Sequence, residues 1–134
     1  MNVLLDTHIA LWAITDDERM SGKARNILLS DKNEIYCSCV SAWEISIKHS
    51  LHPEHMPITA KEFANYCGKS GYAMLPVELP HILALDGLAR SADAPKHKDP
   101  FDRMLIAQAK AEDMLFMTHD RMLLYYNEKN ILPV

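Results

Sequence analysis

Apolar and polar positions along the chain follow two patterns, one typical of buried strands and one typical of helices. Short apolar runs between polar residues predict strands, and apolar residues spaced three and four apart predict helices. The strands expected from this pattern cover residues 2–6, 34–38, part of 72–77, 114–118 and 131–134. The expected helices cover residues 7–14, 21–30, 40–51, 59 to 68 or 71, 80–88 and 99–112, and a short helix begins at residue 119.

Strands and helices therefore alternate, with short connections between them. This order is typical of an α/β fold, in which a mainly parallel sheet has helices on both faces. We expect about four to five strands in one domain over residues 1–134. In such a sheet, functional sites form beyond the carboxyl ends of the strands.

Composition and charge limit the classes of function. The chain has 134 residues, 49% of them hydrophobic and 24% charged, which is typical of a globular protein. Its net charge of −4 argues against a protein that holds nucleic acid by bulk positive charge. It does not exclude a nuclease, because an acidic site attracts phosphate once metal fills it.

The expected location is cytoplasmic. No secretory signal is visible, since Asp6 interrupts the first apolar run, and the run over residues 9–14 is too short to cross a bilayer. Cys37, Cys39 and Cys67 cannot all pair with one another, and we interpret them as buried thiols in a reducing compartment.

Acids stand at several expected strand ends and helix starts. Asp6 ends the first strand and Asp120 follows the fourth. Asp99 and Asp102 open the long helix around Pro100. Each acid could simply cap a helix or favour its dipole. A cap and a site residue are compatible, because both place a carboxylate at a helix N-terminus.

Glu44 is the most informative acid. Val40, Trp43, Ile47 and Leu51 form an apolar stripe at helical spacing, and Glu44 points with that stripe. Burying a lone carboxylate is costly, so it needs a partner. The partner is either a metal shared with other acids or a basic side chain in a buried salt bridge.

Four acids at one edge of a sheet would repel one another, and a hard cation resolves this conflict. Mg²⁺ and Mn²⁺ take carboxylate oxygens and retain waters. Such a cation can activate water and neutralise charge on a phosphodiester. Asp6, Glu44, Asp102 and Asp120 together therefore predict a metal-dependent nuclease site.

A small basic patch is expected near this site. His97 is flanked by Lys96 and Lys98, and Arg90 and Arg103 could join them. The patch is either a solvated face or a place where the protein contacts phosphate.

Four segments resemble the PIN-domain family, and within it the toxin subunit of VapBC-type toxin–antitoxin pairs. They are Leu4-Leu-Asp-Thr-His8, Ser41-Ala-Trp-Glu-Ile45, Asp99-Pro-Phe-Asp-Arg-Met-Leu-Ile-Ala-Gln108 and Thr118-His-Asp120. Their order extends over nearly the whole chain, and the segment from Asp99 is the most specific.

The resemblance implies a parallel sheet flanked by helices and an endoribonuclease that depends on Mg²⁺ or Mn²⁺. It also implies a homodimer, an RNA substrate and inhibition by a small antitoxin protein. The family's metal ligands fall on Asp6, Glu44, Asp102 and, more variably, Asp120. Thr7, Asp99, Thr118 and Arg103 are candidates for supporting the ligands or contacting substrate. The alternative is a PIN-fold module that binds RNA or protein without cutting.

Overall fold

The computed structural model describes residues 1–97 and 99–134 and has a parallel five-stranded sheet at its centre. The strand order is β3-β2-β1-β4-β5, and every neighbouring pair is parallel. The strands are β1 (Asn2–Leu5), β2 (Glu34–Ser38), β3 (Ala73–Leu75), β4 (Leu115–Thr118) and β5 (Ile131–Pro133). The predicted fold class is therefore confirmed.

β1 lies in the middle of the sheet because it is apolar on both faces. Val3, Leu4 and Leu5 are fully buried, as expected for a strand that is covered on both sides. The chain adds β2 and β3 on one side of β1 and β4 and β5 on the other. The order therefore reverses between β1 and β4, the position where open α/β sheets place their sites.

Each α-helix begins within one residue of the start that the sequence predicted. Ser21 caps α2 through its side chain, Thr59 and Glu62 form a capping box on α4, and Asp99 caps α6. The helices are α1 (Thr7–Thr15), α2 (Gly22–Leu29), α3 (Cys39–Leu51), α4 (Ala60–Lys69), α5 (Leu79–Ala84) and α6 (Pro100–Glu112). Short 3-10 helices, η1 (Leu85–Gly87) and η2 (Arg121–Tyr125), follow α5 and β4.

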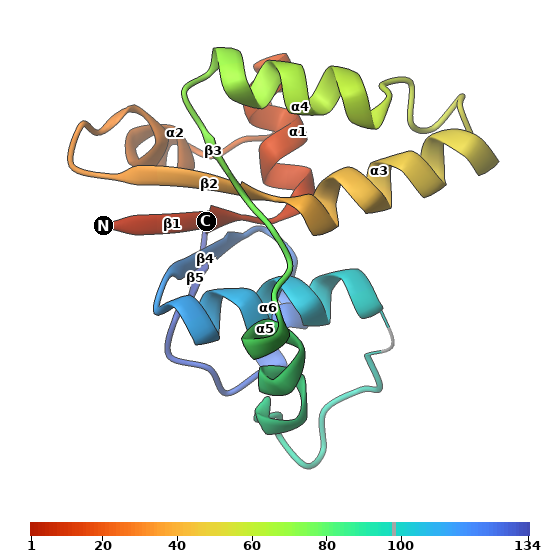
Figure 1. Ribbon diagram of the computed structural model, residues 1–134. Coiled ribbons are helices and arrows are strands. Elements are labelled where there is room, and N and C mark those ends of the chain that lie inside the picture. Colours follow the sequence, from red (N-terminus) through yellow and green to blue (C-terminus); the bar gives the residue numbers. More distant parts are fainter. Residues whose placement is uncertain (98) are drawn as a thin grey trace.

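Two apolar cores lie on opposite faces of the sheet. Figure 1 shows α1, α2 and α4 on one side and α5 and α6 on the other. Val3 and Leu5 belong to the first core, whereas Leu4 belongs to the second, because side chains alternate along a strand. Within the described residues, no helix combines the length and apolarity needed to cross a membrane.

The buried face of α3 differs from the predicted stripe. Its buried residues are Val40, Ser41, Glu44 and Ile45, whereas Trp43 and Leu51 are exposed. Small Ser41 allows close approach and bonds to Thr7 on α1, which rotates the docked face by about one residue. Glu44 is nevertheless buried, as predicted.

The prediction for the cysteines is only partly right. Cys37 and Cys67 are buried, but Cys39 is exposed. Cys39 opens α3 and lies outside the buried face of that helix.

Candidate metal centre

Asp6 lies at the carboxyl end of β1, directly beside the end of β4. Its backbone N–H donates to the carbonyl of Met117 at 3.0 Å, which continues the parallel ladder by one residue. Its side chain is buried, with Oδ1 accepting from the Thr7 N–H (2.8 Å) and Oδ2 accepting from the Thr118 hydroxyl (2.7 Å). Burial raises the pKa of Asp6 in spite of these hydrogen bonds.

Thr118 connects Asp6 to Asp120. Its hydroxyl donates to Asp6 and accepts the backbone N–H of Asp120 at 3.0 Å. The side chain of Asp120 accepts the N–H of Met122 at 2.9 Å and caps η2. Asp120 is exposed, so it lies at the rim of the site. The predicted capping role is present, and the charge of Asp120 also helps to raise the pKa of Asp102.

Glu44 reaches the same region from α3 and has partners on both oxygens. Oε1 accepts from the Thr7 hydroxyl at 2.8 Å, and Oε2 pairs with the ammonium of Lys48 at 2.5 Å. Thr7 has one hydroxyl hydrogen and gives it to Glu44, so the 2.8 Å contact between Thr7 and Ser41 must be donated by Ser41. The burial of Glu44 therefore depends on two hydroxyl side chains and one lysine.

The salt bridge considered for Glu44 is thus present, but only the carboxylate of the pair is buried. Lys48 lies one turn further along α3, and its side chain is 44% exposed. Burial lowers the pKa of Lys48, but the contact with Glu44 outweighs this effect and raises it. The charges of Asp99 and Asp102 add to the rise. One half-exposed cation therefore lies among several acids, and it cannot neutralise them all.

Asp102 enters from the first turn of α6. Asp99 fixes this turn by accepting the N–H groups of Phe101 (2.9 Å) and Asp102 (3.2 Å), and Pro100 suits the first helical position. Burial raises the pKa of Asp102 to about 8. This value includes the effect of the neighbouring acidic charges, which raise the pKa in the same direction as burial; these are Asp6, Asp99, Glu44 and Asp120. The carboxyl groups therefore share one electrostatic environment.

The donor set fits a hard divalent cation. Carboxylate oxygens in a partly desolvated pocket are the ligands of Mg²⁺ and Mn²⁺. Burial, and then the charges of the neighbouring acids, raise the pKa of Asp102, and a bound cation would favour its ionised form. Asp6, Glu44 and Asp102 would hold such a cation from three elements, and exposed Asp120 could approach from the rim.

A different group of residues brings its possible metal-ligand atoms closest together. Across residues 1–97 and 99–134, the ligand atoms of Glu78, His81 and Glu112 all lie within 4.8 Å of one another, and the predicted acids form no such group. Hydrogen bonds from Thr7, Thr118 and Lys48 hold the predicted acids in place instead. Mg²⁺ keeps several waters, so its carboxylates need not all be in mutual contact.

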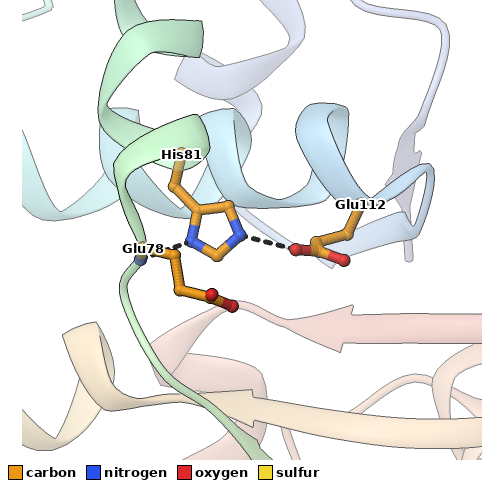
Figure 2. Close-up of side chains that lie close together, drawn as sticks. All are labelled: Glu78, His81 and Glu112. Atoms are coloured by element: carbon orange, nitrogen blue, oxygen red, sulfur yellow. Dashed lines mark hydrogen bonds and ion pairs between the residues drawn. The ribbon is translucent and has the colours of Figure 1, made fainter.

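The group around His81 is already paired internally (Figure 2). The buried imidazole accepts the backbone N–H of Glu78 on Nδ1 at 3.0 Å. Nε2 must then carry the ring proton, and it donates to Glu112 at 2.8 Å. Because both ring nitrogens are engaged, we interpret this group as a clamp between α5 and α6. Nothing in the sequence pattern indicated it.

The residues of the predicted basic patch differ in exposure, since Lys96 is exposed whereas His97 and Arg103 contact protein groups. His97 is largely buried and touches Asp102, with Nε2 3.3 Å from Oδ2. Arg103 donates to the hydroxyl of Tyr126 at 3.2 Å and to the carbonyl of Leu85 at 3.5 Å. Lys98 lies outside the described residues. His97 and Arg103 are therefore held by protein groups next to Asp102.

Sequence reasoning missed Lys48, Ser41 and Tyr126. Lys48 was readable, because a lysine four residues after a glutamate on a helix commonly pairs with it. Ser41 and Tyr126 carried no local signal, since their partners are 34 and 29 residues away.

Three solved structures illustrate that the fold is shared with known proteins. A chain of VapBC2 from Rickettsia felis, bound to a DNA fragment from its promoter, aligns with a TM-score of 0.65 at 15% identity, over 100% of this chain and 98% of that one. A toxin–antitoxin complex from Klebsiella pneumoniae gives 0.59 at 15% identity, over 97% and 95%. FitAcB from Neisseria gonorrhoeae gives 0.54 at 16% identity, over 88% and 87%.

A comparison with curated protein sequences gives no match. The family model of the PIN domain, in contrast, matches residues 3–129, which include all the predicted ligands. The chain belongs to the PIN domain family.

Proposed function

We propose that this protein is an endoribonuclease that depends on Mg²⁺ or Mn²⁺ and serves as the toxin of a toxin–antitoxin pair. The observation that carries the proposal is the convergence of acids beyond β1 and β4, with the pKa of Asp102 raised to about 8. A folded protein tolerates such uncompensated charge poorly unless a cation relieves it. The family of the chain and its structural neighbours support this assignment.

The protein side of the mechanism is to hold carboxylates in place before substrate arrives. Thr118 orients Asp6, Thr7 orients Glu44, and the Asp99 cap orients the first turn of α6 with Asp102. A cation bound there would activate a water for attack on a phosphodiester and neutralise charge as the bond breaks. These hydroxyls and caps keep the ligands from rotating away from one another.

Lys48 supports the same reaction from α3. Its ammonium neutralises part of the acid cluster while no cation is bound. Its half-exposed side chain is free to turn toward the solvent side of the site, where a phosphate would approach. Asp120 is also exposed.

The test is RNA cleavage by purified protein in Mg²⁺, in Mn²⁺ and in chelator. We expect cleavage that requires metal and is absent from Asp6→Asn prepared in parallel, which excludes a contaminating ribonuclease. If wild-type protein binds RNA but leaves it intact in both metals, the chain is the non-catalytic binding module instead.

The partner of the toxin would be a small protein that covers the site. The structural neighbours are toxin–antitoxin complexes, and the uncompensated acids offer a place for a basic side chain. Because RNA and such a partner meet in the cytoplasm, that is the location we propose. Adding the small protein encoded next to this gene should stop cleavage, and an unaffected rate would refute the regulatory part.

We also propose that the toxin forms a homodimer through an apolar groove of about 610 Å³ between α3, α5 and α6. Trp43, Val77 and Ile82 line it and are exposed. Exposed apolar surface of this kind marks an interface. Sedimentation should give a dimer for wild type and a monomer for Ile82→Asp.

A further inference from the structure

His97 lies between the buried hydroxyl of Tyr126 and the carboxylate of Asp102, which is one of the proposed metal ligands. Its Nδ1 is 2.8 Å from the hydroxyl of Tyr126, and its Nε2 is 3.3 Å from Oδ2 of Asp102. Tyr126 is buried, and its ring meets the His97 ring edge-on with centroids 5.5 Å apart. Its hydroxyl also accepts from Arg103 at 3.2 Å. A continuous chain of hydrogen bonds therefore runs from Arg103 to Asp102.

The direction of every bond in this chain is fixed by its two ends. A guanidinium can only donate, and the Asp102 carboxylate can only accept once it is ionised, as it must be to bind a metal. The Tyr126 hydroxyl accepts from Arg103 and gives its hydrogen to Nδ1 of His97. Nε2 of His97 then carries the ring proton and donates to Asp102. The chain thus selects one tautomer and one orientation of the imidazole.

Tyr126 is itself held firmly. The guanidinium of Arg90 lies over its ring at 4.9 Å and that of Arg103 at 5.9 Å. Arg90 also forms an isolated antiparallel bridge with Tyr126 through the backbone. The segment that carries His97 is therefore attached to the C-terminal part of the chain, and the imidazole has little freedom to leave Asp102.

We propose that His97 is a positioning residue that holds the carboxylate of Asp102 in the orientation needed to bind a divalent cation. Tyr126 fixes the imidazole, and Arg103 fixes Tyr126. This inference rests on the proposed function, because it gives Asp102 a metal to bind. It assigns His97 a role different from contact with the RNA phosphate, since both of its nitrogens face protein groups.

The experiment measures the dissociation constant for Mn²⁺ by calorimetry, without RNA, in wild type and variants. Losing a group that orients a metal ligand typically weakens affinity about 10- to 100-fold. We expect this loss in His97→Ala and a smaller loss in Tyr126→Phe. His97→Gln should retain most of the affinity, because its amide nitrogen can replace Nε2 as the donor to Asp102.

The matched control is His49→Ala, which removes a half-buried histidine whose Nδ1 contacts the backbone carbonyl of Met56 instead of a carboxylate. It should leave Mn²⁺ affinity unchanged. A positioning role also predicts non-additivity. Tyr126→Phe should have no further effect on Mn²⁺ affinity when His97 is already alanine, because Tyr126 acts only through the imidazole.

Unchanged Mn²⁺ affinity in folded His97→Ala, with wild type binding normally, overturns the inference and leaves the proposed function standing. If His97→Ala fails to fold, Tyr126→Phe decides, and wild-type affinity in that variant overturns the inference. Additive losses in the double variant also overturn it, because they indicate general loosening. Wild-type protein that binds no Mn²⁺ overturns both proposals.

Discussion

Two clusters of carboxylates lie on this fold, and they differ in how their charge is balanced. At the α5–α6 contact, His81 satisfies the backbone of Glu78 and the carboxylate of Glu112 with one neutral imidazole. Beyond β1 and β4, Asp102 is surrounded by other acids, and its pKa is raised to about 8. The first cluster has the shorter distances between ligand atoms, but the second has the unresolved electrostatic conflict.

This difference indicates which cluster serves chemistry. A closed group of donors and acceptors stabilises a helix contact and gains little from an added ion. A group of desolvated like charges costs stability, and a folded chain retains it where a ligand restores the balance. Proximity of ligand atoms alone would choose the wrong cluster here.

The largest expected effect separates the clusters by activity. Asp6→Asn and Asp102→Asn should each reduce RNA cleavage about 1000-fold or more, because each removes charge worth several kcal/mol of transition-state stabilisation. Glu112→Gln should cleave normally, since its amide oxygen still accepts from His81. Rates are compared on folded protein in the same Mn²⁺ buffer. An inactive Glu112→Gln together with an active Asp102→Asn would show that the wrong cluster was assigned to catalysis.

The second effect is the pH dependence of stability in chelator. An aspartate in the unfolded chain has a pKa of about 4, whereas Asp102 in the folded protein has a pKa of about 8. The folded state therefore binds more protons between these values, and stability is present below pH 4 and lost as pH rises to about 8. At about 1.4 kcal/mol for each pH unit between these two pKa values, the expected loss is on the order of 5 kcal/mol.

Urea unfolding at several pH values measures this loss. Asp102→Asn should show a clearly flatter profile, because its amide does not titrate. Glu112→Gln should follow wild type. Equal pH profiles for wild type and Asp102→Asn would show that the Asp102 carboxyl is not strained by its neighbours.

The sequence anticipated the sheet and helices because their signals are local. Ser21, Thr59 and Asp99 cap the helices that follow them, as their side chains allow. The run Val3–Leu5 is buried on both faces. The predicted site acids also lie at strand ends or helix starts, or face inward, so their convergence follows from the parallel topology.

The features that the sequence did not predict depend on contacts between segments that are distant along the chain. The stripe through Trp43 and Leu51 was wrong because α3 docks through Ser41, whose hydroxyl meets Thr7 across 34 residues. Helical spacing gives a period but cannot choose between faces that differ by one residue. Similarly, His97 has a surface-like sequence context between two lysines, and only Tyr126 shows that it is an internal group.

The third effect concerns stabilisation by metal. At about 100 times its dissociation constant, Mn²⁺ should raise the free energy of unfolding of wild type by about 2.7 kcal/mol. Glu112→Gln should gain the same amount, and Asp102→Asn should gain much less. Thermal melts with Mn²⁺ and with chelator provide the measurement. If the melting temperature of wild type is the same with Mn²⁺ and with chelator, the acid cluster holds no cation.

The smallest effect tests whether Lys48 acts as a substitute cation at the open cluster. Lys48→Met keeps the length of the side chain and removes the ammonium from Glu44. Stranding a fully buried carboxylate costs about 3–5 kcal/mol, but the half-exposed Lys48 is screened by solvent. We therefore expect the variant in chelator to lose only about 1 kcal/mol. Mn²⁺ should abolish this difference, because a bound cation replaces the missing charge. The matched control is Lys110→Met, which breaks a similarly exposed lysine pair with Glu128 that includes none of the predicted ligands. Its loss of stability should be the same with and without Mn²⁺. If Mn²⁺ fails to rescue Lys48→Met, then the ammonium and the metal do not compensate the same carboxylates, and Glu44 is a structural acid.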